Sequence, residues 1–311
     1  MAAAGAAAQP AGFPDKPVQI TTPFAVGSGP DAVLRQVGDK LAKLWGQPVT
    51  IVNRPGGGGF IAIDAVRRLP ADGYNLLQLD SEHLAALPWL YRSKNFTTLE
   101  HFDPVAPMFR TPFLVAVSAT SSWRDMKDLV AAAKTAAPPL AYGSWGVGSP
   151  GHLGGERLEL LTGTAMSHVA YREVSQLFAS VATGDVGWSF ASIPSSQALF
   201  KAGKIRYIAV AAPRRIAQMP EVPTVAEAGG PAAFEVNSFV SLLAPKGIAD
   251  EVATKINRDV LQVLADPEVK ARFDSYAYEI LGWSPDAIRH NAEAKYRIYE
   301  ELVKRKNIRL D

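Results

Sequence analysis

Strand-like and helix-like segments alternate along most of this chain, and this alternation limits the possible fold more than any other feature of the sequence. The first series runs through residues 18–22, 31–45, 48–53, 60–69 and 74–79, in the order strand, helix, strand, helix, strand. In the first helix-like segment, apolar residues recur at helical spacing. Such alternation is typical of βαβ units, so we predict an α/β fold of mainly parallel sheets flanked by helices.

A second series of the same kind follows, and it indicates a second lobe. Its strand-like segments are 113–117, 140–144, 167–171, 186–190 and 205–212, and its helix-like segments are 123–136, 151–163, 175–184 and 194–203. An extended stretch then leads into helices near 249–264, 267–276 and 284–305. We expect a discontinuous first lobe of residues 13–113 plus 241–311, a second lobe of residues 114–240, and a two-strand hinge at 113–119 and 235–245.

Composition excludes several classes of protein. The 311 residues are 48% apolar and 20% charged, as in an ordinary globular protein, and the net charge of +2 comes from scattered side chains. No basic stripe predicts a nucleic-acid partner. The absence of cysteine excludes thiolate catalysis, disulfides and cysteine metal sites. Residues 1–12, MAAAGAAAQPAG, are expected to be a disordered tail, either the remnant of a cleaved signal peptide or a native extension.

The turn after the first strand is the first candidate binding loop, because ligands of open parallel sheets bind beyond the carboxyl ends of the strands. In 23-PFAVGSGPD-31, glycines precede a helix whose first N–H groups and positive dipole end suit a carboxylate or phosphate. Gly27, Gly29 and Ala32 also match the dinucleotide pattern G-x-G-x-x-A. A dinucleotide site needs an acid after the second strand, where this chain has Asn53. An anion loop, a nucleotide loop and a turn that binds nothing remain the alternatives.

Two turns of the second series could hold the other end of a ligand. In 144-SWGVGSPGH-152, hydroxyl groups and backbone amides could bind an anionic group, and His152 either contacts the ligand as a neutral ring or packs locally. Arg172 could pair with a carboxylate in bidentate fashion or form a surface pair with Glu173. Trp145, Trp188, Phe190 and Phe24 supply aromatic surface near the predicted cleft, although aromatic residues are more often core.

The loop 80-DSEHL-84 contains two acids beside the predicted anion site. Asp80 and Glu82 would repel a carboxylate unless they point away or bond to backbone amides. We therefore expect Ser81 and His83 to make the ligand contacts in this loop.

Catalytic signatures are missing from the sequence. There is no G-x-S-x-G, H-E-x-x-H or phosphate-binding G-x-x-x-x-G-K-[ST] motif. The five histidines show no metal-ligand spacing. We expect no catalytic residue, no cofactor and no metal.

Eight segments along nearly the whole chain resemble one family, the tripartite tricarboxylate transporter substrate-binding proteins, also called Bug or TctC proteins. They are 14-PDKPVQI-20, 23-PFAVGSGPD-31, 47-QPVTIVNRPGGGG-59, 72-DGYNLL-77, 142-YGSWGVGSPGHL-153, 201-KAGKIRYIAV-210, 219-MPEVPTVAEAG-229 and 241-SLLAPKG-247. The resemblance implies a periplasmic binding protein, type II-like, with two lobes that close on a small carboxylate. It also implies a monomer that serves membrane transporter subunits of the same system.

The resemblance also implies which loops hold the ligand. The first lobe would contribute Phe24, Ala25, Val26, Gly27, Ser28, Gly29 and Asp31 to the proximal group. The second lobe would contribute Ser144, Trp145, Gly146, Ser149, His152, Tyr171 and Arg172 to the distal end. From the residues themselves, we expect Ser81, His83, Phe190 and Ala191 as further ligand contacts. The family usually has PFPPGGGTD and YKGG where this chain has 23-PFAVGSGPD-31 and 171-YREV-174. Because side chains replace two glycines, an aromatic or longer dicarboxylate is expected over citrate.

Two other functions remain open from the sequence. A sensor subunit that presents the same fold to a membrane kinase would have the same sequence features. A nucleotide-dependent α/β enzyme is the further alternative, and the missing acid after the second strand argues against it.

Overall fold

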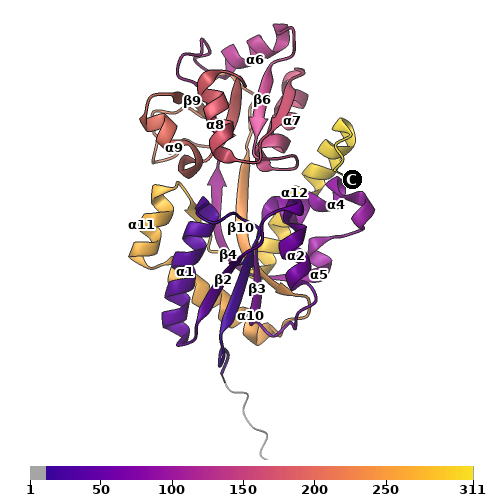
Figure 1. The fold of residues 1–311 in the computed structure, drawn as a ribbon, viewed down its shortest axis with the longest axis vertical. Coiled ribbons are helices and arrows are strands. Elements are labelled where there is room, and N and C mark those ends of the chain that lie inside the picture. The colour runs from indigo at the N-terminus through magenta and orange to yellow at the C-terminus, as the bar shows by residue number, and fades with distance from the viewer. Residues whose placement is uncertain (1–11, 311) are drawn as a thin grey trace, which may run out of the picture.

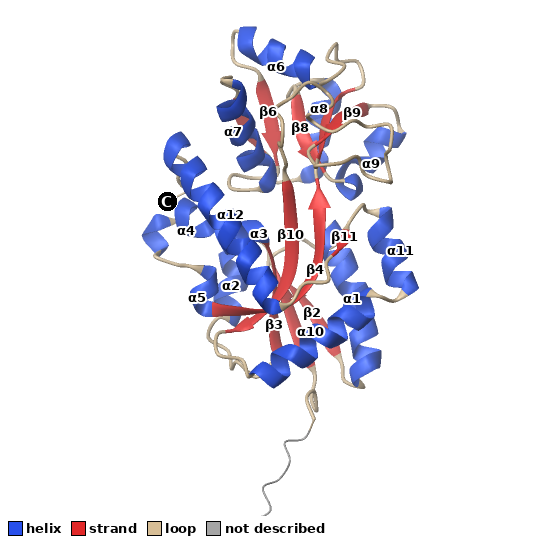
Figure 2. Ribbon diagram, turned by 180° about the vertical axis from the view of Figure 1, so that it is seen from behind, coloured by secondary structure: helices blue, strands red, loops and turns tan. Residues whose placement is uncertain are grey.

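Two β-sheets, each covered by helices, make up the computed structural model, which describes residues 12–310 (Figures 1 and 2). The expectation for the tail therefore lies, except for residue 12, outside the described residues. Within this range, none of the helices combines the length and the apolar character needed to span a membrane.

The first sheet has six strands in the order β11-β4-β10-β3-β1-β2. They are β1 (Val18–Thr22), β2 (Val49–Asn53), β3 (Asn75–Asp80), β4 (Phe102–Pro112), β10 (Asn237–Pro245) and β11 (Glu279–Ile280). The helices of this lobe are α1 (Gly29–Trp45), α2 (Phe60–Val66), α3 (Ser81–Ala85), α4 (Leu87–Leu90), α5 (Thr98–His101), α10 (Asp250–Leu264), α11 (Pro267–Ser275) and α12 (Pro285–Lys306), with the short 3-10 turns η1 (Gly57–Gly59) and η2 (Arg92–Lys94).

The second sheet has five strands in the order β7-β6-β8-β5-β9. They are β5 (Leu114–Ser118), β6 (Ala141–Ser144), β7 (Ser167–Ala170), β8 (Trp188–Ala191) and β9 (Ile205–Val210). Its helices are α6 (Met126–Thr135), α7 (Pro150–Thr162), α8 (Val174–Thr183) and α9 (Ile193–Lys201).

Both sheets are mixed, which corrects the prediction of mainly parallel sheets. In the first sheet β1 runs parallel to β2 and β3, but β10 runs antiparallel to both β3 and β4. In the second sheet β6 runs parallel to β7 and β8, while β5 runs antiparallel to β8 and β9. The reason is topological: β4 leads out of the first sheet and β10 returns to it, so the two strands must run in opposite directions.

Strand β4 was not predicted from the sequence, because it contains prolines that argue against a central strand. Its pairing with β10 shifts register at two points, between Val240 and Ser241 and between Leu242 and Leu243. Ser241 pairs with Pro107 and Leu243 with Pro104, so each irregularity lies beside a proline that cannot donate to the ladder. The bulges let a proline-containing segment cross the middle of the sheet.

The chain crosses between the lobes at two adjacent points. β4 continues into β5 through Phe113, and the return passes through Val236 into β10. The Phe113 N–H donates to the Val236 carbonyl at 3.2 Å, and the Val236 N–H donates to the Ala211 carbonyl at 2.9 Å. These bonds hold the two crossings side by side, as Figure 2 shows for β4 and β10.

The predicted apolar face of α1 is buried, as its spacing indicates. Val33, Leu34, Val37 and Leu41 are fully buried against the first sheet, whereas Leu44 remains 42% exposed at the end of the helix. This packing fixes α1 so that its N-terminus lies beyond the carboxyl end of β1.

Candidate functional site

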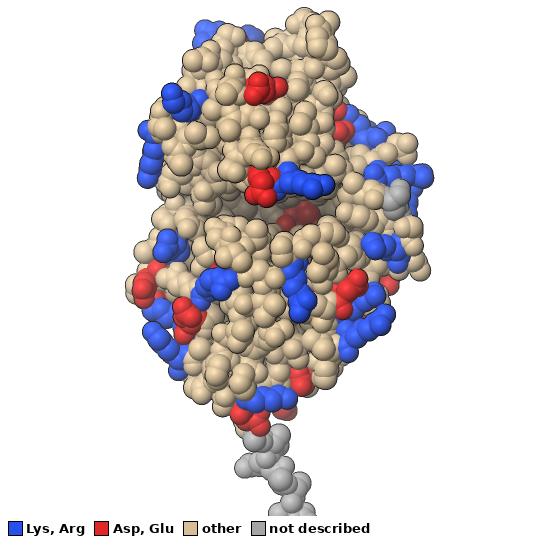
Figure 3. Space-filling model, viewed as in Figure 1, with Lys and Arg blue, Asp and Glu red and all other residues tan. Residues whose placement is uncertain are grey.

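Loops from both sheets meet in the space between the lobes. Because β6, β7 and β8 are parallel neighbours, the loops that lead into α7, α8 and α9 share one edge of the second sheet. β1 and β3 likewise end at one edge of the first sheet. A Cβ built on Gly29, at the start of α1, would lie 3.1 Å from Pro194 Cγ, at the start of α9. The two edges therefore face each other, across the hollow that Figure 3 shows in the middle of this face.

Asp31 organises the loop between β1 and α1. Its Oδ2 accepts the Gly27 N–H at 2.8 Å and the Arg35 Nε–H at 3.1 Å. Its Oδ1 accepts Asn53 Nδ2 at 2.7 Å, and the same amide donates to the Phe24 carbonyl at 3.0 Å. Burial alone would raise the pKa of Asp31, but the hydrogen bonds from Arg35, Asn53 and Gly27 lower it. Asp31 is therefore ionised, and both of its carboxylate oxygens accept hydrogen bonds from the protein. These bonds fix the shape of the predicted ligand loop.

The tip of this loop is exposed, as a binding loop requires. Ala25, Val26 and Gly27 are all exposed, and Val26 has 73% of its surface accessible. Gly27 has φ of 80°, a conformation that glycine adopts without strain. Ser28 caps α1 with an extended backbone, and its buried Oγ has no hydrogen-bond partner within residues 12–310. With Gly29, these residues place the first N–H groups of a 17-residue helix beside the hollow.

Ser144, the first polar residue of the turn before α7, forms its hydrogen bonds within the protein. Ser144 is fully buried, and its Oγ donates to the Gly146 carbonyl at 2.9 Å and lies 2.7 Å from His168 Nε2. The Gly146 N–H donates back to the same hydroxyl at 3.2 Å. Ser144 therefore closes the turn, and its side chain does not reach the hollow.

Ser149 and His152 also build this turn. Ser149 caps α7 by accepting the His152 N–H at 3.3 Å. His152 is 4% exposed, and its Nδ1 accepts the Gly148 N–H at 3.0 Å. The proton of a neutral His152 ring must therefore lie on Nε2, which is 3.5 Å from Glu156 Oε1. The structural alternative for His152, local packing, is the one that the geometry supports.

Among the predicted residues of the second lobe, Trp145, Tyr171 and Arg172 keep accessible surface, as do the half-buried Gly146 and Ser149. The Trp145 ring lies against Phe113 at the crossing, with centroids 5.2 Å apart, and covers Gly151. Tyr171 is half-buried and its N–H donates to the Ser144 carbonyl, whereas Arg172 is exposed. These three side chains remain candidates for ligand contact.

Phe190 and Ala191 are fully buried, so their side chains do not face the hollow. The Phe190 ring packs edge-on against Trp188 at 5.1 Å and stacks with Phe234 at 6.3 Å in the core of the second lobe. The expectation that Phe190 supplies aromatic ligand surface does not fit this packing, because both faces of β8 are buried, with Phe190 in one apolar cluster and Ala191 in another.

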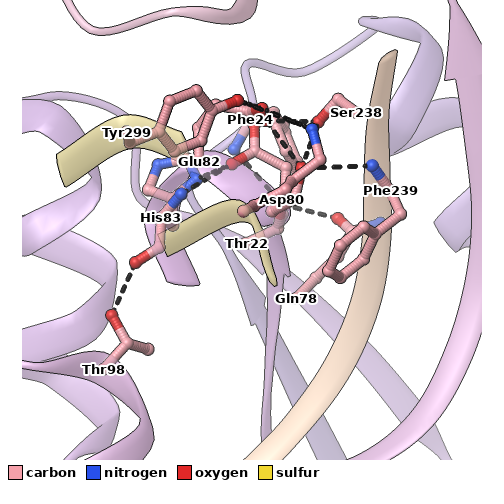
Figure 4. A network of polar contacts seen from close by, with 12 residues as sticks. Thr22, Phe24, Gln78, Asp80, Glu82, His83, Thr98, Ser238, Phe239 and Tyr299 are labelled. Carbon is pink, nitrogen blue, oxygen red and sulfur yellow. Dashed lines mark hydrogen bonds and ion pairs between the residues drawn. The ribbon is translucent and has the colours of Figure 1, made fainter. Parts of the chain in front are cut away.

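The segment predicted as a loop at 80–84 forms the short helix α3, in which Ser81 and Glu82 are buried. Figure 4 shows Glu82 beside Ser238 and Tyr299. Ser81 is fully buried, and its Oγ contacts Ser238 Oγ at 3.3 Å and donates to Glu82 at 3.0 Å. Glu82 also accepts hydrogen bonds from Ser238 and Tyr299, each at 2.5 Å, and pairs with Lys295 at 3.2 Å. Ser81 thus belongs to a buried network with the crossing strand β10, away from the predicted ligand contact.

Asp80 and His83 form a separate pair at the end of β3. Asp80 Oδ1 lies 2.5 Å from His83 Nδ1 and accepts the His83 N–H at 2.9 Å. The Phe24 and His83 rings meet edge to face with centroids 6.1 Å apart. Gly59, with φ of 89°, lies so close to the imidazole that a Cβ there would collide with it. His83 therefore lies beside the predicted anion loop, between Phe24 and the glycine run.

Sequence reasoning missed three residues that shape this region. Asn53 ties Asp31 to Phe24, and Pro194 and Tyr278 pack against Gly29. Asn53 could have been found, because it occupies the strand end where a dinucleotide site would have an acid. Pro194 and Tyr278 are far from the loop in sequence, and no local pattern indicates them.

A cavity of about 360 Å³ lies behind β10, between α7 and α12. It is lined by Arg110, Pro150, Leu153, Gly154, Arg157, Ala233, Glu235, Val236, Asn237, Phe239, Trp283, Asn291, Ala294, Lys295, Ile298, Tyr299 and Leu302. None of the predicted ligand-binding residues lines it. Within residues 12–310, no cluster of three or more His, Cys, Asp or Glu side chains could hold a metal ion.

Comparison with curated proteins identifies relatives along most of the chain. A UPF0065 protein from the tcbD-tcbE intergenic region of Pseudomonas sp. strain P51 is 29% identical over 94% of this chain and 86% of its own length. A UPF0065 protein of Bordetella bronchiseptica is 31% identical over 86% of this chain and 78% of its own length. The protein BugT of Bordetella pertussis is 29% identical over 89% of this chain and 85% of its own length.

Solved structures share the fold. The adipate complex of Rpa4515 from R. palustris has a TM-score of 0.85 and 29% identity, and the match covers 96% of this chain and 100% of that one. MatC from Rhodopseudomonas palustris with bound malate has a TM-score of 0.81 and 24% identity, over 94% and 100% of the two chains. These similarities confirm the two-lobed periplasmic binding protein fold. The model of the tripartite tricarboxylate transporter family receptor, TctC, matches residues 33–307, and the chain therefore belongs to this family of solute receptors.

Proposed function

We propose that this protein binds a small organic carboxylate in the hollow between its lobes and delivers it to membrane subunits of a tripartite tricarboxylate transporter. The proposal places the protein in the periplasm and treats it as a monomer. The family to which the chain belongs supports the receptor role and the transport system.

One observation carries the proposal: helix N-termini from both lobes converge on the same space. α1 begins against α9, and α7 and α8 begin at the same edge of the second sheet as α9. Each helix presents the positive end of its dipole there, although side-chain caps already occupy some of the first N–H groups of α7 and α9. An anion with a negative group at each end would bind both edges at once, and would therefore stabilise the closed arrangement of the lobes.

We favour a linear dicarboxylate as the ligand. The adipate-bound neighbour, at 29% identity, supports a dicarboxylate of medium length. An aromatic carboxylate is the second choice, because burial of Phe190 leaves Trp145, Tyr171 and Phe24 as the aromatic groups proposed near the hollow. Arg172 and Tyr171 are the side chains proposed to contact the distal carboxylate. The proximal one is proposed to bind the amides of Ala25, Val26 and Gly29, since the Gly27 and Ser28 N–H groups are bonded within the loop.

Lobe closure is the proposed mechanism, with the adjacent crossings at Phe113 and Val236 as the hinge. The lobe boundaries, 13–113 plus 241–311 and 114–240, stay a prediction in this scheme. Ligand that bridges the lobes would shift the population toward the closed state by its higher affinity for that state.

The direct test is a thermal-shift panel of linear dicarboxylates from succinate to suberate, with the matching monocarboxylates and aromatic acids. A dicarboxylate at about a thousand times its Kd should stabilise the folded state by about 4 kcal/mol. The amide derivative of the best acid is the control and should not raise the melting temperature. Failure of every carboxylate to stabilise the protein would overturn the proposal, as would turnover of an ester or a tight NAD complex.

Delivery to a transporter needs its own experiment. Uptake of the labelled ligand into proteoliposomes that contain the membrane subunits should require this protein. If ligand binding instead stimulates a membrane kinase and supports no uptake, the protein is a sensor. Light scattering after size-exclusion chromatography tests the monomer.

A further inference from the structure

We propose that Asp80 and His83 form a ligand subsite on the first lobe, in which Asp80 holds His83 Nδ1–H while Nε2–H donates to an anionic oxygen of the ligand. This inference rests on the proposed carboxylate-binding function and assigns one contact within it. The subsite would contact the carboxylate that the first lobe holds, beside the loop between β1 and α1. Four observations support it.

The position of the ring is the first observation. His83 lies on α3, directly after β3, and its ring meets Phe24 of the β1–α1 loop edge to face at 6.1 Å. Gly59 leaves room for the ring because it has no Cβ. His83 is therefore held between the predicted anion loop and the glycine run, at the edge of the sheet that faces the hollow.

The direction of its hydrogen bonds is the second observation. Nδ1 is bound to Asp80 Oδ1 at 2.5 Å, and the peptide N–H of His83 donates to the same oxygen at 2.9 Å. The His83 carbonyl accepts Thr98 Oγ1 at 2.5 Å, which fixes the backbone. Within residues 12–310, Nε2 has no hydrogen-bond partner. It is not completely buried either, because part of its surface is accessible. The side chain keeps 16% of its surface exposed, so Nε2–H is available to a ligand.

Charge in the surroundings is the third observation. Burial alone would lower the pKa of His83, but the charge and hydrogen bond of Asp80, with the charge of Glu82, raise it. Glu82 is itself satisfied by Lys295, Ser238 and Tyr299 (Figure 4). The Tyr91 and Tyr299 hydroxyls have raised pKa values and stay neutral.

The fourth observation is the net charge of the Asp80–His83 pair, which explains how Asp80 can lie beside a site for an anion. With His83 protonated, Asp80 and His83 sum to zero, and Nε2–H attracts a carboxylate. With His83 neutral, the charge of Asp80 remains and repels the same carboxylate. Affinity for a dicarboxylate should therefore fall as pH rises through the pKa of His83, although the ligand itself stays fully ionised.

The first experiment needs no ligand. Long-range ¹H–¹⁵N spectra of the histidine rings report the charge of each imidazole, and His83→Gln identifies the His83 signals. We expect His83 to remain an imidazolium above the ordinary histidine pKa of about 6.5, and Asp80→Asn to remove that shift. A neutral His83 at about pH 7 in the wild-type protein would overturn the inference.

The second experiment measures binding of adipate and of hexanoate, which has the same length and one carboxylate, by calorimetry at about pH 6 and about pH 9. For both acids, His83→Gln and the higher pH should each weaken Kd by roughly 10- to 100-fold, because each acid presents a carboxylate to the first lobe. His290→Gln, an exposed residue of α12, is the matched control and should bind as the wild type does. Circular dichroism confirms that each variant is folded.

The outcomes separate the two proposals. If adipate binds the wild type and His83→Gln equally well at both pH values, the subsite is wrong and the receptor function stands. If neither adipate nor any other carboxylate of the thermal-shift panel binds the wild type, the proposed function fails, and the subsite fails with it.

Discussion

Asp31 shows how a single carboxylate can determine the shape of a binding loop. Its oxygens accept hydrogen bonds from Gly27, Arg35 and Asn53, although the side chain is almost completely buried. The sequence pointed to Asp31 as a ligand contact because it begins the helix after the glycines. Its role in the structure is to hold the loop that presents the backbone amides.

Asp31→Asn should destabilise the protein by about 1.5–3 kcal/mol, because hydrogen bonds to a buried charged group are lost. Urea denaturation at neutral pH measures this change, and ligand affinity should fall with it. Asp39→Asn, on an exposed position of the same helix, is the control and should leave the midpoint unchanged. Equal midpoints for Asp31→Asn and the wild type would contradict the assigned role.

The same variant has a pH signature. The pKa of Asp31 is lowered in the folded state from 3.8, so its stabilisation is present above that value and is lost as pH falls through the folded-state pKa. The difference in unfolding free energy between wild type and Asp31→Asn should therefore shrink below about pH 4.

Gly29 tests the contact between the two sheet edges. A Cβ at this position would collide with the Tyr278 hydroxyl and crowd Pro194. Alanine is favoured over glycine in a helix by at most about 1 kcal/mol. We expect the steric cost, about 1–3 kcal/mol, to exceed this gain in helix propensity, so Gly29→Ala should lower the urea midpoint. Tyr278→Phe removes the colliding atom and should restore part of the loss in a double-mutant cycle, whereas strictly additive effects would argue against this contact.

At the scale of elements, His168 joins β7 to β6 and α7. Its Nε2 lies 2.7 Å from Ser144 Oγ, and its ring stacks on His152 with centroids 4.1 Å apart. Burial, together with the nearby His152, lowers the pKa of His168 to about 4. The turn before α7 therefore depends on a neutral imidazole from a neighbouring strand.

His168→Gln should flatten the pH dependence of stability between about pH 6.5 and about pH 4. In the wild type the unfolded chain binds a proton on this residue more readily than the folded one, so unfolding free energy falls as pH drops through that window. Urea unfolding across the window measures the slope. His290→Gln should keep the wild-type slope, and an unchanged slope in His168→Gln would show that His168 is not responsible.

At the scale of the whole molecule, α12 ties the lobes together. Lys306, near its end, pairs with Glu159 and, at 3.0 Å, with Glu156 of α7. Burial alone would raise the pKa of Glu156, but hydrogen bonds from His152 and Lys306 lower it to about 2. Leu153 of α7 packs in one apolar cluster with Leu302 of α12 beside these ion pairs.

Lys306→Met should weaken the contact between the lobes and shift the ligand-free protein toward an open form. We expect a larger radius of gyration in small-angle X-ray scattering and weaker ligand binding, because closure becomes less favourable. Lys304→Met is the matched control, since Lys304 pairs with Glu300 within the same helix. A scattering curve for Lys306→Met that matches the wild type would contradict this role.

Because the folded-state pKa of Glu156 is depressed, the wild-type contact between Lys306 and Glu156 should persist as pH falls until about pH 2.

The sequence by itself determined which turns lie at the carboxyl ends of the strands. Periodicity located α1, the alternation of segments placed helices close to α7 and α9, and the glycines of 23–31 indicated a helix N-terminus beside a candidate binding loop. These signals are local, because helix caps and turns depend on residues that are close in the chain. The two-lobed fold followed from the same alternation and was confirmed.

Only the tertiary structure decided where the side-chain atoms in those turns point. Ser81 and Ser144 were expected to face a ligand, and His152 either to do so or to pack locally; each is bonded inside the protein. The partners of Ser81 and Ser144, namely Ser238 and His168, come from distant segments. The antiparallel pairing of β10 was also decided by the tertiary structure, because β10 returns to the first sheet only after the chain has formed the second sheet. A hydrogen bond between distant residues depends on the packing of whole elements, and the local pattern of a sequence carries no record of it.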